Sequence, residues 1–460
     1  MPAATTESGK PMTRMPPSNR PHIVLITCHD LGRWLGCYGV DSVRSPHLDA
    51  LAAEGVRFAQ AYCTAPGCSP SRAALATGRC PHANGVMGLA HPPFGWDLYP
   101  GEQPIAAQLA AHGYTTHLFG LQHVTRDISR LGFQHAHRRE GAANGRPYHA
   151  PDVAAEVVAF LGAAQPSTPL YLEINLEEPH RPYDQGGVLP DATRGVTVPP
   201  YLPDTVAARD EFAALQGAIH AADAAIGRIV AALDGAGLRE RTLLVFTTDH
   251  GVAMPRAKCT LYDPGIGVAL IVRWPEGGVG GGREIAPLVS NVDVLPTLLA
   301  AAGVPAPLDL QGRSFLPLLR GEPYQPRDAI FAEKTYHSYY DPMRAIRTER
   351  HKFIRNFDKS FLVEVPGDVQ VGPIYRSEDQ LYVAAAHPDI ELYDLAADPT
   401  EQHNLAGNPA LAAIERDLDT RLWRWMAATD DPLLRGPIPS PSYRRTMEAF
   451  RRARGDPDVM

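Results

Sequence analysis

Apolar runs of strand length alternate with segments of helical periodicity along the first 325 residues of the chain. The run at residues 22–28 is continuously apolar, as expected of a strand that is covered on both faces. Further strand-like runs lie at 114–120, 170–176, 242–248 and 269–274, and helix-like segments lie at 48–54, 103–111, 152–161 and 207–236. This alternation predicts an α/β fold with a large doubly wound mixed sheet flanked by helices.

The pattern changes after about residue 325. Short strand-like segments at 329–333, 344–348 and 352–356 precede a helix-like segment at 410–427, so we expect a smaller C-terminal α+β domain with a short antiparallel sheet. The expected organisation is a disordered leader, a catalytic domain, this subdomain and a Pro-rich tail that wraps the surface, at residues 1–20, 21–325, 326–429 and 430–460 respectively.

Composition narrows the class of protein. The net charge of −8 argues against a general nucleic-acid binder, and no stretch approaches the ~20 apolar residues of a membrane span. The leader lacks the apolar centre of a secretory signal, and the six cysteines follow no compact disulfide spacing. We therefore expect a cytoplasmic protein with reduced thiols, without nucleic-acid or membrane partners.

Polar clusters follow several of the predicted strands. His29-Asp30, His123, Glu178-Pro179-His180 and Asp249-His250 each come at or shortly after a strand end. Any one of them could be a local cap or turn. Ligands of doubly wound sheets collect at the carboxyl ends of strands, so the set together predicts a functional site there.

The segment Cys68-Ser69-Pro70-Ser71-Arg72 combines a cysteine, a proline and an arginine where a loop enters a predicted helix. Pro70 suits the first helical turn, and Cys68 then lies at the helix N-terminus, where the backbone favours negative charge. Arg72 lies one turn further and can reach the same side. A buried structural cysteine is the plainer alternative; an anion pocket around residue 68 is the functional one.

Asp30 and Asp249 are candidate ligands for a hard divalent cation such as Ca²⁺ or Mg²⁺. His250 is adjacent and could add a nitrogen ligand, which would also suit Mn²⁺ or Zn²⁺. His123, His180 and Lys258 are candidate donors to a tetrahedral anion.

The segment that runs from Cys68 through Thr77-Gly78 resembles the signature of the type I sulfatases of the alkaline phosphatase superfamily. The resemblance extends from about residue 22 to residue 406 and is strongest to the heparan N-sulfatase (N-sulfoglucosamine sulfohydrolase) branch. The other similar pieces are residues 45–51, 120–123, 178–181, 248–251, 342–344, 391–394 and 398–405.

The resemblance implies an alkaline-phosphatase-like fold and assigns a role to each of several site residues. Cys68 would be oxidised to formylglycine by a formylglycine-generating enzyme and would also neighbour the metal. Asp30, Asp249 and His250 would bind that metal, Ca²⁺ first, with Mn²⁺, Mg²⁺ or Zn²⁺ as alternatives. The catalytic residues would be Cys68, Arg72, His123, His180 and Lys258.

The implied reaction is hydrolysis of a sulfate ester or sulfamate, with a small-molecule or oligosaccharide substrate. The hydrated aldehyde would attack sulfur, His180 or Lys258 would protonate the leaving group, and His123 would act as base when sulfate is eliminated. We expect Glu178, His337 and Arg344 to contact the sugar, although each is equally explained as an ordinary loop or strand residue.

Two positions depart from the family pattern. His29 stands where the first of two acidic residues is usual, so Ca²⁺ affinity would fall or His29 would itself ligate a softer ion. Leu121 stands where a lysine is usual, which removes one cation from the sulfate pocket. Two alternatives therefore stay open: a phosphonate monoester or phosphodiester hydrolase of the same superfamily, and a non-catalytic relative that binds a sulfated glycan.

Overall fold

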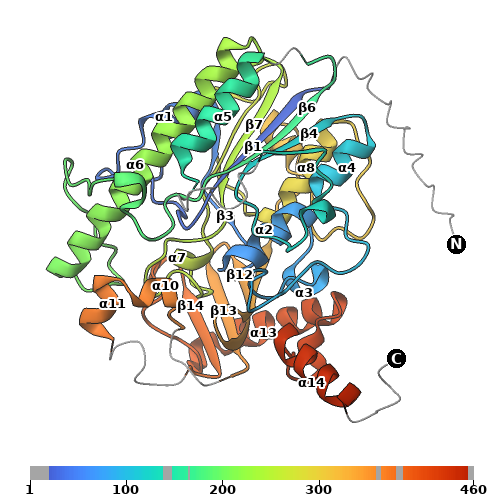
Figure 1. Cartoon of the computed structure of the whole chain (residues 1–460). Coiled ribbons are helices and arrows are strands. Elements are labelled where there is room, and N and C mark those ends of the chain that lie inside the picture. The colour runs from blue at the N-terminus through green and yellow to red at the C-terminus, as the bar shows by residue number, and fades with distance from the viewer. Residues whose placement is uncertain (1–19, 138–147, 164–165, 359–363, 380–386, 454–460) are drawn as a thin grey trace, which may run out of the picture.

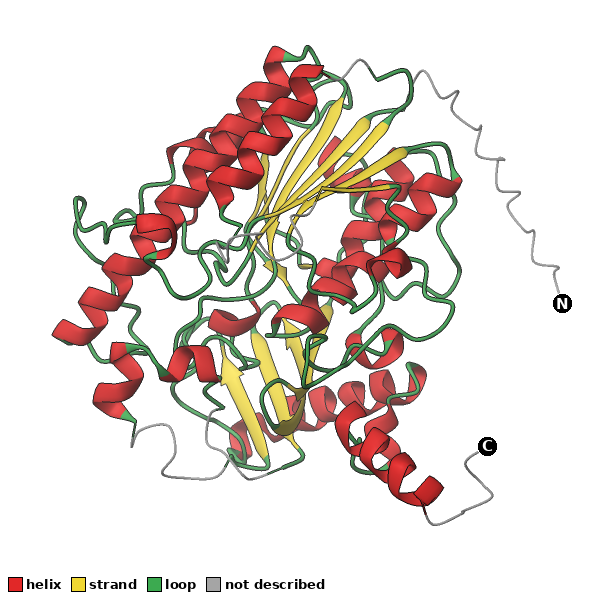
Figure 2. Cartoon of the chain, viewed as in Figure 1, coloured by secondary structure: helices red, strands yellow, loops and turns green. Residues whose placement is uncertain are grey.

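The computed structural model describes residues 20–137, 148–163, 166–358, 364–379 and 387–453. The expected leader lies, apart from Arg20, outside these described residues. A large sheet with helices on both faces forms the upper part of the molecule in Figure 2, and a smaller sheet lies below it.

The large sheet has eight strands and mixed direction, as the sequence predicts. Its order is β5-β4-β6-β1-β7-β8-β2-β9. The pairs β7–β8 and β2–β8 are antiparallel and the other neighbours are parallel. In that order the strands span His135–His137, Thr115–Gly120, Leu170–Asn175, His22–Cys28, Thr242–Thr248, Leu270–Arg273, Val56–Phe58 and Arg283–Ile285.

Alternate residues of the central strand β1 enter opposite hydrophobic cores, which explains its continuous apolar run. Val24 and Ile26 pack with α1 (Pro46–Glu54), α5 (Ala150–Ala163) and α6 (Val206–Gly235). Ile23 and Leu25 belong to the core on the other face, beneath α2, α4, α8 and α9, which span Cys68–Thr77, Ile105–Ala111, Val294–Ala301 and Leu316–Arg320. Figure 1 shows the two helical layers on either side of the sheet.

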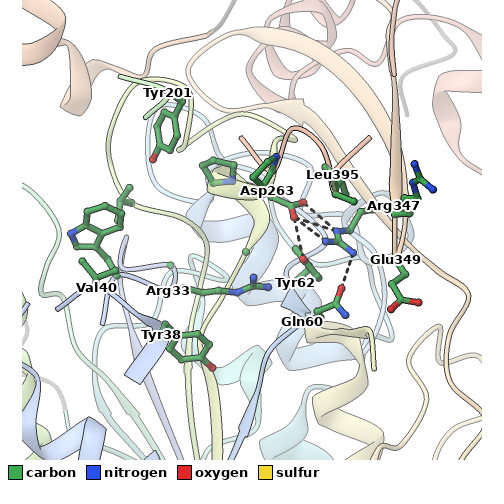
Figure 3. Close-up of a pocket in the computed structure, with 18 residues that line it drawn as sticks. Arg33, Tyr38, Val40, Gln60, Tyr62, Tyr201, Asp263, Arg347, Glu349 and Leu395 are labelled. Carbon is green, nitrogen blue, oxygen red and sulfur yellow. Dashed lines mark hydrogen bonds and ion pairs between the residues drawn. The ribbon is translucent and has the colours of Figure 1, made fainter. Parts of the chain in front are cut away.

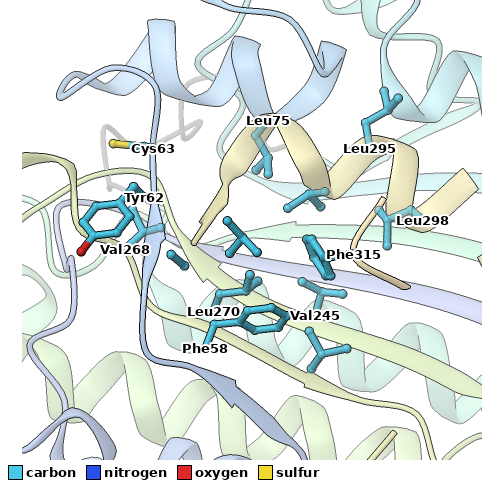
Figure 4. Close-up of a cluster of buried hydrophobic side chains, with 14 of the residues drawn as sticks. Phe58, Tyr62, Cys63, Leu75, Val245, Val268, Leu270, Leu295, Leu298 and Phe315 are labelled. Carbon is cyan, nitrogen blue, oxygen red and sulfur yellow. The ribbon is translucent and has the colours of Figure 1, made fainter. Parts of the chain in front are cut away.

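The core between the sheet and α2 contains large aromatic side chains that pack against one another. Phe58 and Phe315 meet edge to face with ring centroids 4.9 Å apart. Figure 4 shows these rings beside Val245 and Leu270 of the sheet, with Leu295 and Leu298 of α8 nearby. This packing fixes the face of the sheet on which α2 rests.

The smaller sheet is antiparallel and C-terminal, again as predicted. It comprises β11, β12, β13 and β14 in that order, at Ala329–Tyr336, Tyr340–Thr348, His351–Asn356 and Ile390–Asp394. One face packs against α13 (Ala412–Ala428), while Met343 and Ile354 of the other join the core beneath α2. The remaining strands and α-helices of the described residues are β3, β10, α3, α7, α10, α11 and α14, at Ala61–Tyr62, Val289–Ser290, Pro81–Asn84, Asp263–Ile266, Gly367–Gln370, Pro373–Glu378 and Pro441–Ala453.

None of the helices in the described part of the chain is both long enough and apolar enough to cross a membrane.

Candidate active site

The strands β1 and β7 end side by side, and this register creates the site. Cys28 pairs with Thr248 at the last rung, so the residues that follow each strand emerge together. The Asp30 N–H donates to Asp249 Oδ1 at 2.9 Å, and the Asp249 N–H donates to the carbonyl of Cys28 at 3.2 Å. The two aspartates are therefore held together by the backbone of the parallel strands.

Helix α2 brings Cys68 to the same point. Gly67 precedes the helix in an extended conformation, and Cys68 is its first residue. Ser71 donates a hydrogen bond to the carbonyl of Asp249, and Arg72 Nε lies 3.0 Å from Asp249 Oδ2. The helix start is thus anchored to the end of β7, and Cys68 Sγ lies 3.5 Å from His250 Nε2.

Five buried side chains converge here: His29, Asp30, Cys68, Asp249 and His250. Each offers a ligand atom, and these atoms all lie within 4.8 Å of one another. Two carboxylates, two imidazoles and one sulfur form a donor set that fits a divalent cation. His250 Nδ1 lies 2.9 Å from the carbonyl of Gly251, an arrangement that orients Nε2 toward the cluster, as second partners of metal-bound imidazoles do.

Cationic and imidazole side chains surround this cluster. Lys258 Nζ lies 2.8 Å from Asp30 Oδ2, and His180 Nε2 lies 3.7 Å from the same oxygen. The rings of His29 and His180 contact edge to face at 4.5 Å. His123 lies beside Cys68, close enough to lower the pKa of its thiol. All the catalytic and metal residues expected from the sequence are therefore gathered within one buried site.

Attraction between opposite charges determines the direction of the pKa shifts in this cluster, because water is excluded and the charges are poorly screened. Burial alone would raise the pKa of Asp30, but Lys258 and His29 hold it well below its usual range. Burial would lower the pKa of His29, yet Asp249 and its neighbours raise it to about 10. Asp249 and Asp30 likewise hold the pKa of His250 well above its usual value. Both carboxylates are therefore ionised, and the two protonated rings, Lys258 and Arg72 balance their charge.

The same charges act on the thiol. Burial would raise the pKa of Cys68, but Lys258, His29 and the hydrogen bonds of its imidazole neighbours hold it well below the usual thiol value. Burial lowers the pKa values of His123 and His180, because the charged ring loses its hydration. A neutral imidazole at position 123 can accept a proton from residue 68.

Two residues that contact the site were not predicted from the sequence. Asp368 of α10 lies 2.7 Å from Lys258 Nζ and 3.8 Å from His180 Nε2. His91 Nδ1 lies 2.8 Å from His123 Nε2. Both residues lie outside the strand ends, and no motif at either position indicated its place in the fold.

The three expected sugar contacts differ in their surroundings. Glu178 is buried and accepts the Ala150 N–H at the start of α5, so it serves as a cap. Arg344 is fully buried, and its guanidinium pairs with Asp431. The polar groups of both residues are thus engaged within the protein, and their roles as sugar contacts stay predictions.

His337 lies beside Gly67, the residue that precedes Cys68. It packs against Gly67, where an added Cβ would lie 3.2 Å from His337 Cδ2. Its role as a sugar contact stays a prediction.

A cavity of about 870 Å³ opens on a different side of the same loops. Gly32 and Val252 line it, and Figure 3 shows Arg33 and Arg347 beside Tyr62. The two guanidinium groups lie 4.5 and 4.4 Å from the centre of that ring. None of the five clustered side chains lines this cavity. The volume of a cavity is therefore not a guide to the candidate active site in this protein.

Comparison with known families agrees with this geometry. The family model described as sulfatase matches residues 21–304, and the model of the C-terminal part of N-sulphoglucosamine sulphohydrolase matches residues 255–373.

Individual proteins match over most of their length. The chain is 29% identical to human N-sulphoglucosamine sulphohydrolase, over 90% of this chain and 91% of the relative. It is 32% identical to human arylsulfatase A, over 86% and 85% respectively. A putative sulfatase from Bacteroides thetaiotaomicron superposes with a TM-score of 0.73 at 22% identity, over 92% of this chain and 96% of that structure.

Proposed function

Because the chain belongs to the sulfatase family, we propose that it hydrolyses sulfate esters or sulfamates with a formylglycine at position 68 and a bound divalent cation. The observation that carries this proposal is the convergence of Cys68 with two ionised aspartates and a ring of proton donors. The name of the human relative, N-sulphoglucosamine sulphohydrolase, supports a sulfated sugar as substrate.

Each part of the site has a task in this proposal. Asp30, Asp249, His250 and residue 68 would hold the cation, with His29 as a further donor. When bound, the ion would polarise a sulfuryl oxygen and favour the ionised nucleophile. The aldehyde made from Cys68 by a formylglycine-generating enzyme would supply, as its hydrate, a nucleophile with a second hydroxyl on the same carbon.

The remaining side chains move protons and offset charge. Lys258 and His180 lie on the Asp30 side of the cluster and would donate to sulfuryl oxygens and to the departing oxygen or nitrogen. His123 would take the proton of the second hydroxyl, so that sulfate leaves and the aldehyde returns. Arg72 keeps Asp249 in place through its ion pair.

The six cysteines at positions 28, 37, 63, 68, 80 and 259 form no disulfide in the structure. Unpaired thiols, most of them buried, suit a reducing compartment, so we retain the cytoplasm as the proposed location.

The decisive experiment joins mass spectrometry to kinetics. We expect the peptide containing residue 68, isolated from the native host, to have lost sulfur and gained an aldehyde. Cys68→Ala should lower kcat/KM for an aryl sulfate by at least about 10³-fold, because the nucleophile is removed, and far-ultraviolet circular dichroism should show the fold unchanged. An unmodified cysteine in fully active enzyme would refute the formylglycine mechanism.

Substrate comparison separates the alternatives. Faster turnover of an aryl phosphodiester or phosphonate monoester than of an aryl sulfate would favour the superfamily's other hydrolases. Absence of turnover despite a confirmed aldehyde and bound metal would favour a glycan-binding relative.

A further inference from the structure

A groove of about 670 Å³ begins at the edge of the site and lies between three segments that are distant in sequence. They are the loop after β6, the first part of α6 and the region of α10 and α11. Figure 1 shows α10 and α11 beside the lower end of α6. We call it the acidic groove and define it by Arg181, Tyr183, Asp184, Asp210, Asp368 and Val371. Its volume is within the range of saccharide-sized ligand sites.

The acidic groove is continuous with the groups that would bind sulfate. Asp368 lines it and also contacts Lys258 Nζ at 2.7 Å. Lys258 in turn contacts Asp30 of the metal cluster. A substrate whose sulfate meets Lys258 and His180 therefore has the acidic groove directly beside it.

Negative charge prevails along the acidic groove. Arg181 is its one lining cation, and this guanidinium is already paired with Glu211 and bonded to the carbonyl of Ala253. Among the residues that the structure describes, neither Asp184 nor Asp210 has an ion-pair partner, and both are exposed. Tyr183 and Val371 add apolar surface.

We propose that the acidic groove holds the part of the substrate that remains after desulfation, and that it selects saccharides bearing no negative charge beyond the sulfate being removed. This inference rests on the proposed function. Sugar hydroxyls can donate to the carboxylates of Asp184 and Asp210, whereas a second sulfate or a uronate would meet them as like charges. The apolar side chains suit the C–H face of a sugar ring.

The test compares a monosulfated sugar with its counterpart carrying one added sulfate, each offered as purified substrate. From a panel of sugar sulfates, we would take the best monosulfated substrate and measure kcat/KM for both members of the pair. The native enzyme should prefer the monosulfated member by about tenfold or more, and added salt should reduce this preference because exposed charges are screened. The double variant D184N/D210N should narrow the preference at least about threefold by raising kcat/KM for the disulfated sugar.

Two further variants make the outcome specific. Glu240→Gln removes one exposed charge beside the start of β7, at the opposite end of the sheet from Asp249, and should leave the preference unchanged. Val371→Trp narrows the acidic groove from an exposed position and should lower kcat/KM for the sugar but not for an aryl sulfate. The kcat for an aryl sulfate should be the same in all these variants, since none of the changed residues touches the reacting atoms.

Failure of the proposed function and failure of this inference would give different results. If native enzyme hydrolyses no sulfate at all, the proposed function fails. If it hydrolyses aryl sulfate but no sugar sulfate, or if D184N/D210N and Val371→Trp leave the sugar kinetics unchanged, the acidic groove is not the subsite and this inference is overturned.

Discussion

At the scale of single residues, His29 gives this site its own character. Its Nδ1 lies 2.9 Å from Asp30 Oδ1 and 3.4 Å from Asp249 Oδ2, so a nitrogen stands among the carboxylate oxygens. Ca²⁺ prefers six to eight oxygen ligands, whereas imidazole suits Mn²⁺ and Zn²⁺. The donor set therefore favours a transition ion more than an all-oxygen site would.

Replacing His29 tests this preference. His29→Asp should raise affinity for Ca²⁺ relative to Zn²⁺ by at least about tenfold, because a hard oxygen anion replaces a softer nitrogen. Equilibrium dialysis with elemental analysis measures the ratio without reference to activity. His29→Asn serves as the control, since it removes the imidazole without adding charge. An unchanged ratio in His29→Asp would show that residue 29 does not ligate the ion.

The residues that directly follow strands and those of the Cys68 segment were predictable from the sequence, whereas Asp368 and His91 were not. Asp30, Asp249 and His250 were predictable because a parallel sheet brings the ends of its strands together. Asp368 was not, because its position depends on how α10 packs beside the site, and no local pattern encodes that packing. No local pattern indicated that Arg344 would be buried and paired with Asp431, and its expected contact with the sugar stays a prediction.

At the scale of elements, β1 shows that a hydrophobic pattern in the sequence can predict the bounds of a strand. Its predicted span at 22–28 matches His22–Cys28, because an unbroken apolar run can be satisfied only between two helical layers. The edge strands β5 and β9 have three residues each and contain polar residues, so no comparable run indicated them. The described tail also forms a helix, α14, that its Pro-rich start did not suggest.

The first residue of β1 makes the element sensitive to acid. His22 is buried, its Nδ1 accepts the Leu170 N–H, and burial with Arg241 lowers its pKa to about 4. The unfolded chain, with the ordinary value near 6.5, binds the proton first, so stability should fall as pH drops from about 6.5 to 4. The contribution of this residue is up to about 3 kcal/mol.

Urea unfolding at pH 7.5 and pH 4.5 measures that loss. His22→Gln keeps a hydrogen-bond acceptor but cannot titrate, so the difference in unfolding free energy between the two pH values should shrink. His403→Gln, at an exposed histidine, should leave the difference as it is in the native protein. Equal pH dependence in native protein and His22→Gln would refute the assignment.

At the scale of the whole molecule, one buried ion pair joins the C-terminal segment to the smaller sheet: Arg344 Nε on β12 lies 2.6 Å from Asp431 Oδ2. Arg344→Met should cost about 3 kcal/mol of unfolding free energy, because it leaves the buried carboxylates of Asp431 and Glu333 without this cation. The double variant R344M/D431L should recover much of that loss, which a double-mutant cycle in guanidinium would show. Arg350→Met removes the exposed pair with Asp394 and should cost much less, because water screens exposed charges. Equal losses in the two single variants would mean that burial does not distinguish these pairs and that the segment is held by its apolar contacts instead.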